Sequence, residues 1–191
     1  MLRVLLVNDT NKQVGRLRTA LIQAGCEVVE EVSSALMIPK RVAELKADVV
    51  IIDTESPSRD VLEQICVVSQ DEPRPIVMVS EDTQPAAIKA AIKAGVSAYV
   101  VEDVDAGRLS AVLDIAQARF EQDQALISQI RQAESKLSER KVVERAKGLL
   151  MQLRSMSESE AYHAMRKMAM DRNIRIIDVA YKLLAMNELL A

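Results

Sequence analysis

The chain has 191 residues, 49% of them hydrophobic, which is enough for one good core or for one core and a small additional module. It contains no run of eighteen apolar residues, and its start, MLRVLLVNDT, is too short and too soon acidic for a signal peptide. We therefore expect a soluble, cytoplasmic protein. Cys26 and Cys66 lack metal-ligand spacing, so we expect reduced core cysteines and no zinc or redox site.

The net charge of −3 conceals an uneven distribution along the chain. Residues 1–137 carry 15 Lys and Arg against 21 Asp and Glu, whereas residues 138–191 carry ten against seven. A basic end favours an anionic partner such as a nucleic acid, although ordinary scatter of charge would give the same totals.

Five short β-branched runs alternate with helical patterns in the first 120 residues. The runs are LRVLLV, CEVVEEV, DVVIID, PIVMVS and AYVVE. Between them apolar residues recur at spacings of three and four, as at Val14, Leu17 and Leu21. Alternation of strands and helices indicates parallel βαβ units, and fully apolar runs indicate a sheet covered on both faces. We assign residues 1–118 to a doubly wound α/β domain.

A long helical pattern begins at Leu109, after Gly107. Its apolar residues follow alternating steps of three and four, with two acidic residues among them: Leu113, Ala116, Phe120, Asp123, Ile127, Ile130, Glu134 and Leu137. This imperfect heptad pattern predicts a coiled-coil linker helix over residues 109–140 and favours a homodimer. A single helix lying on its own domain is the alternative.

Residues 138–191 predict a small all-α bundle of three helices. The long helix supplies the first of them. Ser157 and Glu160 have the spacing of a capping box, which predicts the start of a second helix that carries Tyr162 and Met165 inward. A last helix begins near Ile176, and short connections favour compact packing.

Polar residues end the strands of the first domain, where doubly wound sheets collect their chemistry. Asp9 and Asp53 are candidates for holding a Mg²⁺ ion, the only cofactor that the sequence suggests. Asp53 is then a candidate phosphoacceptor, with Ser80 steadying the phosphoryl oxygens. Together with Pro57 and Tyr99, this layout resembles the receiver domain of bacterial response regulators, which implies a flavodoxin-like fold.

The layout departs from the receiver pattern at two positions. The first acidic pair is reduced to Asn8-Asp9, and Glu102 stands where the family has a lysine. A phosphoaspartate adds nearly two negative charges, so a carboxylate partner replaces attraction by repulsion. We interpret the domain as a docking platform whose output a binding protein controls.

Cationic residues gather in the C-terminal module. Arg140, Lys147 and Arg154 are spaced by seven and share one face of the long helix. Further cations lie at the far end of the second helix and in its loop: Arg166, Lys167, Arg172 and Arg175. Such a ridge can hold phosphates while Tyr162 reaches a loop base, and a merely solvated face is the alternative. Helix-turn-helix and zinc-finger patterns are absent, and no nucleophile stands with a base, so we expect no enzyme.

The segment SERKVVERAKGLLMQLRSMSESEAYHAMRKMAM resembles the ANTAR domain, an RNA-binding antiterminator module. In whole-chain order the sequence is similar to NasT-type regulators of nitrate and nitrite assimilation. The resemblance implies a transcription antiterminator that binds hairpin loops in leader RNA and is held inactive by a nitrate/nitrite-sensor protein (NasS-like). The RNA-binding residues that we expect are Arg140, Lys147, Gly148, Arg154, Tyr162, Arg166, Lys167 and Arg172. The alternatives are a phosphorylation-dependent DNA-binding response regulator and a protein-interaction adaptor.

Gly148 lies among helix-forming residues in this segment. An interior glycine costs about 1 kcal/mol relative to alanine. We expect that glycine occupies this position because another group approaches the helix closely there, either a neighbouring helix or an RNA backbone.

The damaged receiver pattern predicts that Asp53 does not serve as a phosphorylation switch. Incubation with acetyl phosphate should leave no stable phosphoryl label on Asp53. The output of the Asp53→Asn variant should be regulated as in the wild type. Stable labelling together with loss of control in Asp53→Asn would contradict this interpretation.

Overall fold

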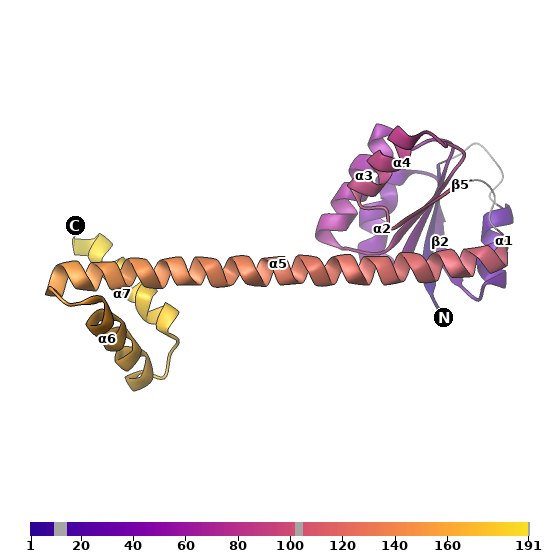
Figure 1. The fold of residues 1–191 in the computed structure, drawn as a ribbon. Coiled ribbons are helices and arrows are strands. Elements are labelled where there is room, and N and C mark those ends of the chain that lie inside the picture. Colours follow the sequence, from indigo (N-terminus) through magenta and orange to yellow (C-terminus); the bar gives the residue numbers. More distant parts are fainter. Residues whose placement is uncertain (10–14, 102–104, 191) are drawn as a thin grey trace. The chain divides into compact units, whose positions relative to one another are not determined.

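The structure, a computed structural model, describes residues 1–9, 15–101 and 105–190 (Figure 1). Contacts within the chain group it into two units, residues 1–124 and 125–191, which are described separately below. The boundaries expected from the sequence, residues 1–118, 109–140 and 138–191, stay a prediction. In the described ranges, no helix is both long and apolar enough to cross a membrane.

The first unit is a parallel sheet covered by helices on both faces, as the sequence predicts. The chain's elements are β1 (Arg3–Asp9), α1 (Gly15–Gln23), β2 (Glu27–Val32), η1 (Ala35–Met37), α2 (Ile38–Leu45), β3 (Val49–Thr54), α3 (Arg59–Asp71), β4 (Ile76–Ser80), α4 (Pro85–Ala94), β5 (Ala98–Val101), α5 (Ala106–Arg154), α6 (Glu158–Asp171) and α7 (Ile176–Leu190). The strand order is β2-β1-β3-β4-β5, and every pairing is parallel. This order confirms the flavodoxin-like fold class.

Two apolar layers enclose the sheet. Buried side chains of α2, α3 and α4 pack on one face, with Ile38 and Ile65 fully buried. Side chains of α1 and the start of α5 pack on the other, with Leu21 and Leu109 fully buried. Figure 1 shows α2, α3 and α4 together on one side of the strands. Cys26 is a free, buried cysteine of the second layer, as expected.

The long helix differs from its prediction at its beginning. It starts at Ala106 rather than at Leu109, because the Asp105 carboxylate accepts a hydrogen bond from the backbone N–H of Arg108 at 2.9 Å. Gly107 therefore lies in the first turn. Leu113 and Ala116 pack into the core of the first unit. The first residues of the expected coiled-coil seam thus serve this core instead.

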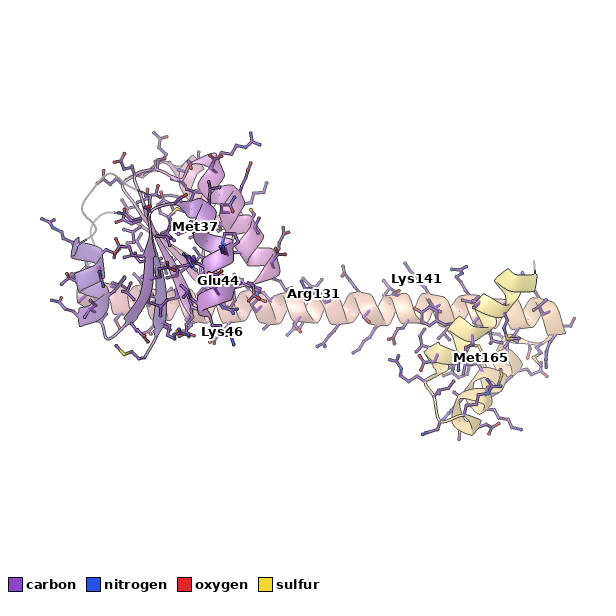
Figure 2. All side chains as sticks on the ribbon, turned by 180° about the vertical axis from the view of Figure 1, so that it is seen from behind. Met37, Glu44, Lys46, Arg131, Lys141 and Met165 are labelled. Carbon is purple, nitrogen blue, oxygen red and sulfur yellow. The ribbon has the colours of Figure 1, made fainter. Side chains whose placement is uncertain are left out.

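The second unit is a three-helix bundle formed by the end of α5 with α6 and α7. Its buried core is Ala146, Leu150, Ala161, Met165, Ala169, Val179 and Ala180. Met165, labelled in Figure 2, is fully buried. Tyr162 was open to two interpretations, packing inward or reaching a loop base. It is 43% exposed and lies outside the buried core of the bundle, which favours the second.

The junction between α5 and α6 is fixed by charged and polar side chains. Ser157 and Glu160 form the predicted capping box, in which each side chain bonds the backbone N–H of the other residue. Lys147 of α5 is only 7% exposed, and its ammonium lies 2.6 Å from Glu144 and 2.8 Å from Glu158. Because Glu158 is the first residue of α6, this bond joins the two helices.

These contacts shift the ionisation of both partners. Hydrogen bonds to Glu144 and then to Glu158 raise the pKa of Lys147, while the bond from Lys147 lowers the pKa of Glu158. A depressed carboxyl pKa stabilises the fold at neutral pH, and this contribution is lost as the pH falls through the pKa of the folded state. The stabilisation that comes from the raised pKa of Lys147 is lost only in alkali. It therefore stays constant over the acid range, where Glu158 titrates.

Glu158→Gln should therefore speed backbone hydrogen exchange in residues 158–186 at neutral pH, because the charge pair to Lys147 is gone. The difference from wild type should persist down to about pH 4.5 and shrink below it, because the pKa of Glu158 in the folded protein is lowered from its ordinary value of 4.5 and the wild-type carboxylate is protonated only there. Mass spectrometry of peptides from residues 158–186, with both proteins at the same pH, measures the exchange rates. Glu121→Gln, an exposed change on α5 outside the predicted seam, is the control. A difference that is unchanged in acid would exclude the ion pair as its cause.

Candidate functional site

The predicted phosphoacceptor lies at the carboxyl edge of the sheet. Asp53 is half-buried near the end of β3, and the register places it beside Asn8. The backbone of Asp9 pairs with Thr54, so Asp9 and Asp53 end neighbouring strands as expected. Glu102 and the side chain of Asp9 lie outside the described residues, and the proposed Mg²⁺ site therefore stays a proposal.

The hydroxyl of Ser80 forms two hydrogen bonds within the protein. The side chain is buried at the end of β4 and donates to the backbone carbonyl of Glu55 at 3.0 Å. The same oxygen accepts from the backbone N–H of Asp82 at 3.2 Å. Ser80 thus ties the loop after β3 to the loop after β4, and it would have to exchange these bonds to steady a phosphoryl group.

Asp82 is a second tie between these loops, and sequence reasoning missed it. Its carboxylate accepts from the Ser56 hydroxyl at 2.6 Å and from the backbone N–H of Gln84 at 2.9 Å. These two bonds, in that order, lower the pKa of Asp82. The Tyr99 hydroxyl donates to the Asp82 carbonyl at 2.9 Å. Only its place two residues after a strand end could have singled out Asp82.

The second unit carries a surface groove beside the exposed ring of Tyr162. Arg166, Met170 and Asn173 line it with Tyr162, and its volume is about 580 Å³. Met170 is 72% exposed. Asn173 adopts a left-handed backbone at φ 50°, which ends α6 and turns the chain toward α7. An aromatic ring, a cation and an amide thus share one groove. The sequence analysis proposed Tyr162 and Arg166 as RNA-binding residues but not Met170 or Asn173.

The predicted cations differ in exposure. Five of them are exposed: Arg140, Arg154, Arg166, Lys167 and Arg172. Across the described side chains, none of these five forms an ion pair. The expected ridge of Arg140, Lys147 and Arg154 needs a correction, because Lys147 is buried between two carboxylates. Arg175 pairs with Asp178 and Glu139.

Gly148 lies in the interior of α5 as predicted. A Cβ atom built on it would meet no atom within 4 Å apart from its chain neighbours and the backbone of its own helix. The expected close approach by a neighbouring helix is therefore not made by the described part of this chain.

Comparison with known proteins assigns both units. The response regulator receiver domain matches residues 4–114, and the ANTAR domain matches residues 131–184. The transcriptional regulatory protein PdtaR of Mycobacterium tuberculosis is 30% identical over 178 residues, covering 93% of this chain and 87% of that protein. The nitrate regulatory protein of Klebsiella oxytoca is 38% identical over 78 residues, or 41% of this chain and 20% of that protein.

Solved structures agree on the fold of the first unit. The receiver domain of the response regulator NarL from M. tuberculosis superposes with a TM-score of 0.52 at 23% identity, covering 60% of this chain and 95% of that domain. Receiver and ANTAR domains are both regulatory. The chain therefore belongs to the response regulators that join a receiver domain to an ANTAR domain.

Proposed function

We propose that the protein is an RNA-binding transcription antiterminator whose C-terminal module binds hairpin loops in a leader RNA. The groove of Tyr162, Arg166, Met170 and Asn173 is the observation that carries this proposal. Single-stranded loops are read by stacking unpaired bases on aromatic rings and guanidinium planes and by bonding their edges. The ring of Tyr162, the guanidinium of Arg166 and the amide of Asn173 supply these three interactions within one groove.

Exposed cations of α6 and of its end suit the phosphate backbone. Arg166 lines the groove, Lys167 follows it on α6, and Arg172 ends that helix. Because no carboxylate of the described part neutralises them, their charge remains available to phosphates. Phosphate contacts supply affinity that falls with added salt, whereas contacts to loop bases supply specificity.

Binding acts on transcription by shifting the balance between two RNA folds. A leader that forms either a protein-bound hairpin or an overlapping terminator is shifted only by the difference in affinity for the two folds. The module binds loop bases, which the terminator fold pairs or removes. It thus stabilises the fold that permits transcription to continue.

A second copy of the chain would present two modules to paired hairpins. The exposed apolar residues of α5 support a homodimer: Leu126, Ile127, Ile130 and Leu137 are between 39% and 58% exposed. A helix that leaves such a stripe uncovered is typical of a coiled-coil seam.

The receiver unit would serve as the docking platform for an inhibitory sensor protein. The hydrogen bonds of Ser80 and Asp82 join the loops after β3 and β4 to each other. Similarity to the nitrate regulatory protein supports nitrate or nitrite as the upstream signal. A docked sensor would then control the output without a phosphate on Asp53.

Tyr162→Ala should weaken binding of a hexaloop hairpin RNA about tenfold, because a stacked base contributes about 1–3 kcal/mol. Fluorescence anisotropy of a labelled hairpin at fixed salt measures the affinity. Tyr181→Ala, which removes the exposed tyrosine of α7, is the matched control and should bind as wild type does.

Competition with duplex DNA tests the remaining alternatives. Duplex DNA that displaces the hairpin at equal concentration would favour a DNA-binding regulator. Absence of binding to either nucleic acid at physiological salt would favour a protein-interaction adaptor and overturn the proposal.

A further inference from the structure

A pocket lies between α6 and α7, apart from the groove of Tyr162. Its volume is about 220 Å³, and five apolar side chains form its walls: Met168, Ile174, Val179, Leu183 and Met186. Val179, Leu183 and Met186 follow one another at helical spacing along one face of α7. Met168 belongs to α6, and Ile174 lies in the connection between the two helices. The walls therefore come from both helices and from the loop that joins them.

The pocket adjoins the core of the bundle. Val179 is 4% exposed and belongs to that core, whereas Met168, Ile174 and Leu183 pack against it and remain partly exposed. Apolar walls that are left open to water gain free energy when an apolar group covers them. The flexible side chains of Met168 and Met186 can adjust to the shape of such a group. The pocket thus suits an apolar body.

Two cations complete the lining of the pocket, Arg172 at the end of α6 and Lys182 on α7. Both are exposed, and across the described side chains neither forms an ion pair. Asp178, one turn before Lys182, accepts a hydrogen bond from Arg175 at 3.3 Å instead. Among the described residues, no Asp or Glu lines the pocket. Cations beside an apolar surface favour a ligand that carries negative charge.

We propose that this pocket binds a small molecule that joins an apolar body of about eight to ten carbon atoms to one carboxylate. An apolar cavity of about 150 Å³ holds benzene, so a pocket of about 220 Å³ holds a somewhat larger body. The guanidinium of Arg172 can bind both oxygens of a carboxylate, and the ammonium of Lys182 adds a point charge. Medium-chain fatty acids have this chemistry.

The lining of the pocket differs from that of the groove of Tyr162. The groove offers an aromatic ring and an amide, which read an unpaired base, and the described lining of the pocket contains neither. Arg172 is also one of the cations expected to bind RNA phosphates. The experiments below therefore use no RNA, and their results do not depend on the proposed function.

Methyl NMR of the full chain, labelled at its methionines, tests the site with octanoate as the probe. The methyl signals of Met168 and Met186 should shift and saturate, because both side chains line the pocket. Those of Met78, buried in the receiver unit, and of Met170, in the groove of Tyr162, should stay unchanged. Met168→Leu and Met186→Leu assign the signals. Absence of a saturable shift at both methionines, or a larger shift at Met170, would overturn the proposal.

The charge requirement is tested with octan-1-ol, which has the same apolar body and no carboxylate. Wild type should bind octan-1-ol about tenfold more weakly than octanoate, because the charge-assisted hydrogen bonds are missing. The double variant Arg172→Gln/Lys182→Gln should bind octanoate as weakly as octan-1-ol. Arg154→Gln/Lys167→Gln removes two exposed cations outside the pocket and should bind octanoate as wild type does.

Equal binding of octanoate and octan-1-ol by the wild type would overturn the carboxylate, and so would equal losses in the two double variants. All four substituted positions are exposed, so the variants should keep the helical circular dichroism of the wild type. Signals of Met168 and Met186 that shift with protein concentration alone would assign the pocket to a second copy of the chain and likewise overturn the proposal.

Discussion

A single uninterrupted helix, α5, is the constraint on which both units depend. Its first turns bury Leu109 and Leu113 against the sheet of the receiver unit, and its last turns bury Ala146 and Leu150 in the bundle. Helical periodicity fixes which residues share a face, so the requirements of each end dictate what the helix exposes between them. The stretch between them belongs to neither core, and its apolar residues Leu126, Ile130 and Leu137 are exposed.

The charged residues of the C-terminal bundle fall into two groups, those buried between its helices and those exposed to solvent. Lys147 carries the charge that joins α5 to α6, and its carboxylate partners neutralise it. Arg166, Lys167 and Arg172 form no ion pair in the described part and are exposed on α6 and at its end. A buried, paired cation organises the surface, and exposed, unpaired cations provide the binding potential. This division assigns a positioning role to Lys147 and leaves the surface contacts to α6 and its loop.

Elements with a regular local sequence pattern could be predicted from the sequence. Five strands, the capping box of Ser157 and the start of α7 all followed from local pattern. The exposure of Tyr162 and the burial of Lys147 could not be predicted in this way. Adjacent residues of a helix can face the core or the solvent, and the packing of α5, α6 and α7 against one another decides which of them is buried. The bonds of Asp82 join segments distant in sequence, and no local signal marks them.

The proposed function requires that the exposed surface of α6 recognise RNA in the cell. Ultraviolet crosslinking of the protein to RNA in growing cells, followed by sequencing of the recovered fragments, tests it most directly. We expect the recovered fragments to come from leader regions that can fold into hairpins overlapping a terminator. Recovery of no RNA above the level of a sample that was not irradiated would contradict it.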